Sequence, residues 1–195
     1  MRLGRILLAF GTVAAVLAFF AAILAARTGG QDRPPIGGAF RLKSHTGEIV
    51  SSAALKGRPF AIFFGFAGCP EVCPTTMLDM HRLLDRVGPP ARDFKVYFVS
   101  VDPERDTPEM LRDFLASFEP YIIGLTGTPA EIAAVAKSFG AFYRRTPTTG
   151  GDYTIDHSTF VYLMDSAGEY AESIGYQEQE DRALAKLTAL LGSKR

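Results

Sequence analysis

The chain has 195 residues, 47% of them apolar, and its 21 basic residues balance its 21 acidic ones. That length is sufficient for one domain with its own core, and the balanced charge gives no reason to expect a nucleic-acid partner. With two cysteines in all, a disulfide framework and a four-thiolate metal site are excluded, whereas one disulfide or a site with two sulfur ligands stays open.

A charge-free apolar run occupies residues 6–26. At about 1.5 Å per helical residue it is long enough to cross the roughly 30 Å hydrocarbon core of a bilayer. We therefore predict a single-pass transmembrane anchor over residues 1–27, with Arg2 and Arg5 on the cytoplasmic side and the remaining chain in the periplasm. A bacterial inner membrane is the simplest location. The alternative is a cleaved signal peptide, although its apolar region is usually shorter.

The polar, Gly- and Pro-rich residues 28–35 are predicted to be a linker, so the folded domain would cover residues 36–195. Alternation of apolar and polar residues around Phe40 and Leu42, followed by a Thr-Gly turn, predicts a hairpin. His45 lies at its tip. We interpret His45, and His81 further along the chain, as solvated surface residues, because an isolated histidine needs partners before it can be a ligand.

The continuous apolar run at residues 60–65 predicts a strand buried on both faces. A helix is expected over residues 74–87, because Pro74 suits the first helical position and Gly-Pro-Pro follows the last. This start would place Cys73 near the N-cap, where the helix dipole favours a thiolate. Cys69 lies four residues earlier on a glycine-containing loop, so the two sulfurs can converge.

The rest of the domain continues this alternation of strands and helices. The expected strands cover residues 94–101, 121–125 and 141–145, with a late hairpin at 159–164 and 169–174, and the expected helices cover 108–118, 129–140 and 178–191. Thr107 and Thr128 are predicted N-caps, each followed by proline. The pattern predicts an α/β fold with a mixed sheet and helices on both faces. Ligands bind such sheets outside the carboxyl ends of strands, where the cysteine loop and the loop at Asp102 both begin.

His157 follows a Gly-rich loop, residues 146–152, that could bring it to the cysteines. Two thiolates and an imidazole form a soft ligand set that suits copper, particularly Cu(I), and can hold zinc. A closed structural zinc site needs four protein ligands, and no fourth is evident. Met77 and Met80 are one candidate source, but we interpret them as core residues, since methionine fills gaps in cores.

Two other uses of the cysteines remain open. One is thiol–disulfide exchange, with Cys69 or Cys73 as the attacking thiolate. The spacing differs from the C-x-x-C of thioredoxin-type exchangers, and the residues that a peroxiredoxin pattern requires are missing. The other is a structural disulfide, the default for an exported domain with two cysteines.

Charged residues near these motifs also have two interpretations. Asp102, Glu104, Arg105 and Asp106 suit a turn and a helix cap, or alternatively a supporting or docking role at the end of a strand. Asp156 could orient His157 by accepting its second ring N–H.

Four motifs together make the chain resemble the Sco/SenC family, whose members are membrane-anchored copper-binding proteins of thioredoxin-like fold that serve in cytochrome c oxidase assembly. The motifs are Gly65-Phe66 with Cys69-Pro70-Glu71-Val72-Cys73-Pro74, Ser100-Val101-Asp102-Pro103-Glu104-Arg105-Asp106-Thr107, Gly124-Leu125-Thr126-Gly127-Thr128 and Asp152-Tyr153-Thr154-Ile155-Asp156-His157-Ser158. Their order and spacing cover roughly residues 36–191.

The resemblance implies that Cys69, Cys73 and His157 bind copper, as Cu(I) and Cu(II). It implies a metallochaperone that receives copper from a donor protein and serves the dinuclear copper (CuA) site of cytochrome c oxidase subunit II. The alternative that it allows is a thiol–disulfide oxidoreductase in which Cys69 and Cys73 reduce the cysteines of that site. Whether the protein is a carrier or an enzyme therefore stays open at this point.

Overall fold

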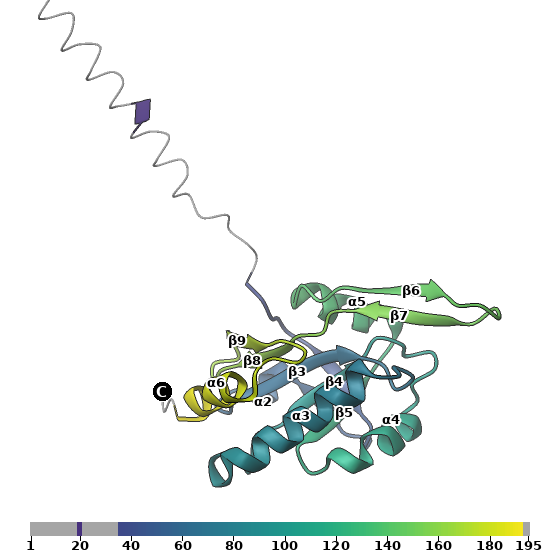
Figure 1. Cartoon of the computed structure of the whole chain (residues 1–195). Coiled ribbons are helices and arrows are strands. Elements are labelled where there is room, and N and C mark those ends of the chain that lie inside the picture. Colours follow the sequence, from purple (N-terminus) through teal and green to yellow (C-terminus); the bar gives the residue numbers. More distant parts are fainter. Residues whose placement is uncertain (1–18, 21–34, 193–195) are drawn as a thin grey trace, which may run out of the picture. The chain divides into compact units, whose positions relative to one another are not determined.

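The computed structural model describes residues 19–20 and 35–192 (Figure 1). The chain divides into two compact units, Met1–Pro34 and Pro35–Arg195. Apart from residues 19 and 20, which are helical, the predicted anchor and most of the predicted linker lie outside the described residues. Within the described part, no helix is both long and apolar enough to cross a membrane.

A seven-stranded mixed sheet forms the centre of the second unit. Its strand order is β2-β1-β5-β4-β3-β8-β9, and the bounds are β1 (Arg41–Ser44), β2 (Ile49–Ser51), β3 (Phe60–Gly65), β4 (Val96–Ser100), β5 (Ile122–Thr126), β8 (Val161–Met164) and β9 (Tyr170–Ile174). The three central strands β3, β4 and β5 are parallel, and the outer pairings are antiparallel. The predicted mixed sheet is confirmed.

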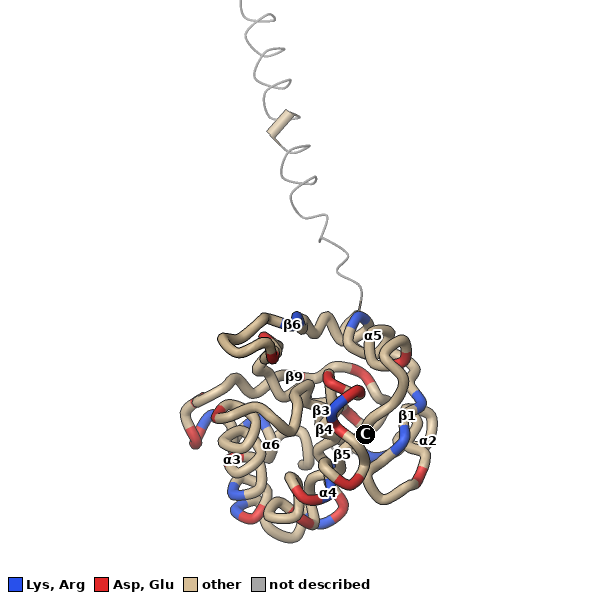
Figure 2. The backbone as a smooth tube through the Cα atoms, turned by 90° about the vertical axis from the view of Figure 1, so that its right-hand side faces the viewer, with Lys and Arg blue, Asp and Glu red and all other residues tan. Residues whose placement is uncertain are grey.

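Helices cover both faces of this sheet, as predicted. They are α2 (Ser52–Leu55), α3 (Val72–Val87), α4 (Pro108–Leu115), α5 (Pro129–Ser138) and α6 (Glu180–Gly192), with 3-10 turns η1 (Pro89–Ala91) and η2 (Ala116–Phe118). Alternate side chains of a strand point to opposite faces. On β3, Phe63 packs against Phe98, which contacts Phe114 of α4, whereas Phe64 packs against Phe139 at the end of α5. Figure 2 shows α3 and α6 next to each other, away from α5.

Helix starts agree with the capping signals except at the cysteine loop. Thr107 and Thr128 cap α4 and α5 through their side chains, with proline at the next position. Helix α3, however, begins at Val72, two residues before the predicted start, with Glu71 as N-cap. Proline is tolerated throughout the first turn, because the N–H groups there have no intrahelical partner. The predicted start at Pro74 was therefore wrong by two residues, and Cys73 lies inside the first turn, two residues after the N-cap.

A second departure is a separate two-stranded sheet made by β6 (Tyr143–Pro147) and β7 (Tyr153–His157). The two strands are antiparallel, with Tyr143 opposite His157. The predicted loop at residues 146–152 is shortened to the turn between them, and His157 is the last residue of a strand. The alternation of Tyr153, Ile155 and His157 carried this strand signal.

The predicted solvation of His45 was also wrong. His45 is only 4% exposed, and its Nδ1 accepts a hydrogen bond from the Gly124 N–H at 2.9 Å. The antiparallel pairing of β1 with β5 brings it there, a long-range contact that the local sequence does not reveal. His81 is partly exposed, with Nε2 3.4 Å from Asp85 and Nδ1 bonded to the Phe118 carbonyl.

Candidate metal centre

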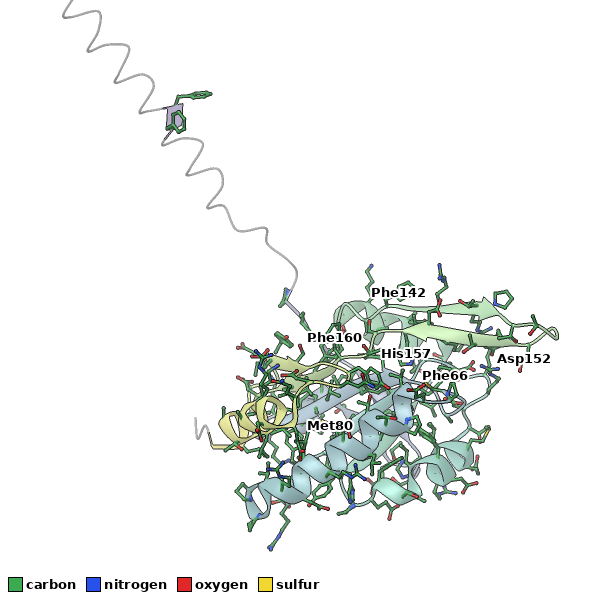
Figure 3. All side chains as sticks on the ribbon, in the orientation of Figure 1. Phe66, Met80, Phe142, Asp152, His157 and Phe160 are labelled. Atoms are coloured by element: carbon green, nitrogen blue, oxygen red, sulfur yellow. The ribbon has the colours of Figure 1, made fainter. Side chains whose placement is uncertain are left out.

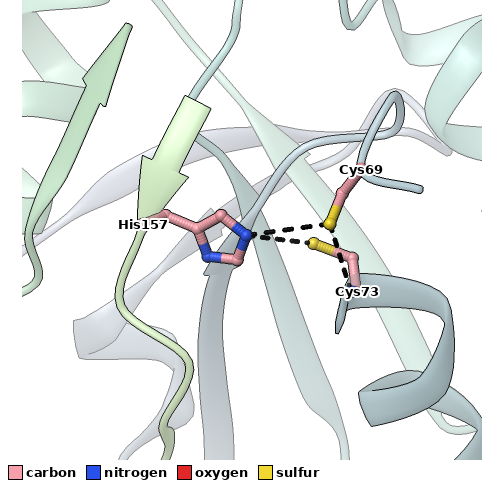
Figure 4. A group of neighbouring side chains, drawn as sticks. All are labelled: Cys69, Cys73 and His157. Carbon is pink, nitrogen blue, oxygen red and sulfur yellow. Dashed lines mark hydrogen bonds between the residues drawn. The ribbon is translucent and has the colours of Figure 1, made fainter. Parts of the chain in front are cut away.

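Cys69, Cys73 and His157 meet at the carboxyl end of β3 (Figure 4). The Nε2 atom of His157 lies 3.5 Å from the Cys73 sulfur and 3.9 Å from the Cys69 sulfur, and all three ligand atoms lie within 4.8 Å of one another. Both cysteines are free thiols. The structure thus brings together the three residues predicted to form one site.

The Cys73 sulfur lies against the backbone of Gly65, in the space that the side chain of any other residue at position 65 would fill. A Cβ built on Gly65 would lie 2.6 Å from Cys73 Sγ and 2.8 Å from the Phe63 ring. Both are shorter than any normal contact. Gly65, which the sequence suggests only as a source of loop flexibility, is needed to make room for the thiol.

The loop that carries Cys69 is held by hydrogen bonds at both ends. Within it, the Cys69 N–H donates to the Phe66 carbonyl at 3.2 Å, and the Cys73 N–H donates to Cys69 Sγ at 3.4 Å. The Ala67 N–H donates to Asp106 Oδ2 at 2.9 Å, and the same oxygen accepts from Ser100 Oγ at 2.6 Å. Asp106 is 2% exposed, so it is a buried support for the loop.

The orientation of His157 is set by its own backbone and by two aromatic rings. Nδ1 lies 2.9 Å from the Ser158 carbonyl, to which its N–H donates, so Nε2 is the nitrogen that faces the sulfurs. The rings of Phe63 and Phe66 meet the imidazole edge to face, with centroids 5.9 and 5.8 Å away. The prediction that Asp156 orients the ring was wrong: Asp156 bonds Arg144 and Thr146 instead, because it points to the opposite face of β7.

The two thiols differ in acidity. The pKa of Cys69 is lowered, chiefly by a hydrogen bond from the Cys73 side chain, with His157 contributing and burial opposing. Burial raises the pKa of Cys73, and its hydrogen bond to Cys69 raises it further. The lowered pKa therefore belongs to Cys69 and not, as the sequence predicted, to Cys73. Burial lowers the pKa of His157, but bonds to Cys69 and the Ser158 carbonyl outweigh it, so its pKa lies above the ordinary value.

The remaining acidic candidates support the site from the β4–α4 loop. Asp102 is fully buried and pairs with Arg105 and, at 3.6 Å, with Arg145. Its other hydrogen bond comes from Tyr153 Oη, at 2.9 Å. Glu104 lies at the exposed rim, where it pairs with Arg145 at 2.7 Å. Tyr153 and Arg145 were not predicted as functional residues. The available signal was an aromatic and a basic residue in the segment just before His157.

Met77 and Met80 are buried in the core, as interpreted from the sequence.

Cys69, Cys73 and His157 together provide a soft site of three ligands, two sulfurs and one neutral imidazole nitrogen. When the proton on Nε2 leaves, its lone pair points at the place where the sulfurs converge.

Comparison with known proteins extends this result. A sequence profile of the SCO1/SenC family matches residues 28–192. The chain belongs to the SCO1/SenC family. It is 40% identical to the SCO2-like protein of Rickettsia felis over 142 residues, which cover 72% of this chain and 69% of that relative.

Solved Sco structures share the architecture. The structure of Bradyrhizobium japonicum ScoI with copper bound is 41% identical, with a TM-score of 0.73 over 80% of this chain and 99% of that one. BsSco, a member of the Sco family of cytochrome c oxidase assembly proteins with an identified disulfide switch, is 26% identical, with a TM-score of 0.66 over 84% of this chain and 98% of that one. The α/β fold, a mixed sheet with flanking helices, thus matches the thioredoxin-like Sco structures.

Proposed function

We propose that this chain is a membrane-anchored copper metallochaperone that binds copper through Cys69, Cys73 and His157. Its acceptor is the dinuclear copper site of cytochrome c oxidase subunit II, and a separate donor protein supplies the ion. The observation that carries the proposal is the convergence of two free thiols and one imidazole nitrogen within 4.8 Å. Residues 6–26 anchor the protein in a bacterial inner membrane, with the domain in the periplasm.

The ligand set fits copper cargo in both oxidation states. Two thiolates alone can hold Cu(I), and a thiolate, thiolate and imidazole set also suits Cu(II), whereas a closed zinc site needs a fourth protein ligand. Binding displaces the protons of Cys73 and of His157 Nε2, since metal ligands must be deprotonated. The lowered pKa of Cys69 supplies one thiolate in advance.

Copper titration of residues 31–195, reduced and oxidised, tests this proposal. We expect one equivalent of copper to bind the reduced protein, and Cys69→Ser to abolish tight binding. Near-wild-type affinity in Cys69→Ser would place the site elsewhere. His157→Ala should weaken Cu(II) more than Cu(I). An oxidised Cys69–Cys73 pair cannot offer two thiolates, so equal uptake by the oxidised protein would contradict a redox-controlled site.

The unequal acidity of the thiols favours a second candidate function, the reduction of a disulfide in the oxidase copper site. The Cys69 thiolate would attack one acceptor sulfur, forming a mixed disulfide and releasing one acceptor thiolate. Cys73 would then attack the Cys69 sulfur, releasing the second acceptor thiol and leaving a Cys69–Cys73 disulfide. Two electrons pass to the acceptor, and the thiol protons accompany them.

Incubation with metal-free subunit II separates the two functions. The copper-loaded protein and the metal-free reduced protein are each mixed with subunit II whose cysteines are oxidised or reduced, and copper and disulfide content are followed in both partners. A carrier transfers stoichiometric copper to the reduced acceptor. A reductase lowers the disulfide content of the oxidised acceptor without copper and turns over when a thiol donor is added.

A further inference from the structure

The β6–β7 hairpin carries His157 but is not part of the seven-stranded sheet (Figure 1). An isolated two-stranded hairpin is marginally stable in water. Its position therefore depends on side-chain contacts with the rest of the domain. Those contacts determine where the imidazole lies.

One face of β7 makes these contacts. Tyr153, Ile155 and His157 alternate along the strand and so share a face. Ile155 is 4% exposed, and the His157 ring lies against Phe63 and Phe66. Tyr153 is at the opposite end of the strand, next to Asp152, which Figure 3 shows well away from His157.

Tyr153 is fastened to the β4–α4 loop by several interactions. Its hydroxyl donates to the buried carboxylate of Asp102 at 2.9 Å. The Arg105 guanidinium lies 3.7 Å from the centroid of the Tyr153 ring and donates to the Tyr153 carbonyl at 3.1 Å. Arg145 of β6 lies 4.7 Å from the same ring and pairs with Asp102. Both strands of the hairpin thus contact one buried carboxylate.

The same loop holds the thiols through a different residue. Asp106, four residues after Asp102, accepts the Ala67 N–H of the cysteine loop at 2.9 Å. The two carboxylates therefore have separate tasks: Asp106 holds the loop of Cys69, and Asp102 holds the hairpin of His157. Because Asp106 bonds the Ala67 N–H independently of the Asp102–Tyr153 contact, we expect the thiol loop to stay attached when that contact is weakened.

We propose that Tyr153 and Asp102 are positioning residues for His157. The contact between Tyr153 and Asp102 keeps the hairpin closed over the two thiols. Opening of the hairpin withdraws the imidazole and leaves Cys69 and Cys73 in place. This inference rests on the proposed copper function, because its consequence is a site that loses one of three ligands reversibly. Cu(II), which depends on the imidazole, is then released more easily, whereas Cu(I) remains on two thiolates.

The test compares Tyr153→Phe with the wild-type protein. This change removes the hydroxyl that bonds Asp102 and keeps the ring that both arginines contact. Because a hydrogen bond to a charged group is lost, we expect hydrogen exchange of the β7 amides in the metal-free reduced protein to rise about ten-fold. Loss of Cu(II) to a chelator should accelerate by a similar factor, and loss of Cu(I) should change little.

Arg144→Gln is the matched control. Arg144 bonds Asp156 at 2.9 Å, so its ion pair joins β6 to β7 without reaching the rest of the domain. We expect the Arg144→Gln protein to lose Cu(II) and Cu(I) to the chelator at rates close to those of the wild-type protein. In a His157→Ala background, Tyr153→Phe should accelerate Cu(II) loss no further, because its effect acts through the histidine.

Several outcomes would overturn the inference: unchanged β7 exchange in Tyr153→Phe, equal acceleration of Cu(I) and Cu(II) loss, or an undiminished effect in the His157→Ala background. Failure of the proposed function gives a different result. In that case wild-type and His157→Ala proteins release Cu(II) alike, while exchange of the β7 amides still reports whether Tyr153 holds the hairpin.

Discussion

Gly65 lies at the end of β3, beside the Cys73 sulfur. Its missing side chain matters at the scale of a single residue, because the 2.6 Å approach of a Cβ to Cys73 Sγ is impossible without movement. The other near atoms belong to Phe63 and Phe98, both fully buried ring systems. A close-packed core has little room to accommodate a displaced sulfur.

Gly65→Ala should therefore disturb the site and the core together. We expect the free energy of unfolding to fall by about 1–3 kcal/mol, as for other overpacked cores, and copper affinity to fall because Cys73 Sγ is displaced. Gly68→Ala is the control in the same loop, since its Cβ would meet Phe66 at an ordinary 3.6 Å. Chemical denaturation and copper titration measure both effects. Wild-type copper affinity in Gly65→Ala would contradict this account.

The acidity of Cys69 is a second property of single residues. Its largest cause is the hydrogen bond from Cys73, so Cys73→Ala should raise the pKa of Cys69 towards its ordinary value. Thiolate absorbance of the metal-free reduced protein, followed against pH, measures this change. An unaltered Cys69 titration would show that Cys73 is not the cause.

The lowered pKa of Cys69 makes the stability of the fold depend on pH. Because the folded-state pKa of Cys69 lies below the unfolded value, ionisation stabilises the fold fully above about pH 8.5, the ordinary thiol value. That contribution is lost as the pH falls through the folded-state pKa. Denaturation of the reduced wild-type protein and of Cys73→Ala at several pH values should show a smaller loss on acidification in the variant.

At the scale of elements, the loops after β3 and β4 depend on each other. The Val101 N–H donates to the Gly65 carbonyl at 2.8 Å, and Asp106 joins the Ala67 N–H to Ser100 Oγ. Burial raises the pKa of Asp106, against the opposing effect of these two hydrogen bonds. The parallel pairing of β3 with β4 brings the two strand ends to one edge.

Asp106→Ala should release the cysteine loop. It leaves the buried Ser100 hydroxyl and the Ala67 N–H without their acceptor, which costs about 1–3 kcal/mol for each unsatisfied group. Asp106→Asn keeps one acceptor oxygen and should lose less stability and less copper affinity. The two variants are compared by denaturation and by copper titration. Equal losses would mean that the negative charge, not the accepted hydrogen bonds, supports the loop.

Elements with a local signal were predictable, and those fixed by distant contacts were not. Thr128 with Glu131 forms the expected capping box, because both partners are three residues apart. His45 is buried by β5, about 80 residues away in sequence, and no local pattern contains that information. The His157 strand was missed although Tyr153, Ile155 and His157 alternate with polar residues, because the Gly-rich stretch just before it indicated a loop.

At the scale of the whole molecule, the described domain has its own core and belongs to a compact unit, Pro35–Arg195. Two of the proposed ligands, Cys69 and His157, are 88 residues apart in the sequence. The sequence could therefore identify the ligands by residue type and by family resemblance, but not by their spacing. A supporting role for Asp102 and Asp106 could be offered only as one of two alternatives, and Tyr153 was missed, since all three act through tertiary hydrogen bonds. Sequence spacing does not encode such bonds.

Removal of residues 1–30 tests the proposed anchor. Because those residues belong to the other compact unit, the shortened protein should fold and bind copper as before, and it should leave the membrane fraction. Fractionation of cells that express each form, with copper titration of the purified domain, gives the result. A shortened protein that stays with the membrane would show that the anchor prediction is wrong.

The two cysteines differ in their exposure to solvent. Cys73 is 0% exposed and Cys69 8% exposed, and His157 is half-buried at the rim. A ligand group of a partner protein must therefore reach Cys69 or His157 before it can reach Cys73. We expect a bound ion to be handed over in a fixed order, with the Cys73 bond broken last. If the protein is the copper carrier proposed above, the partner would already hold the ion at that stage, and the ion would pass between the proteins without being released into the surrounding solution.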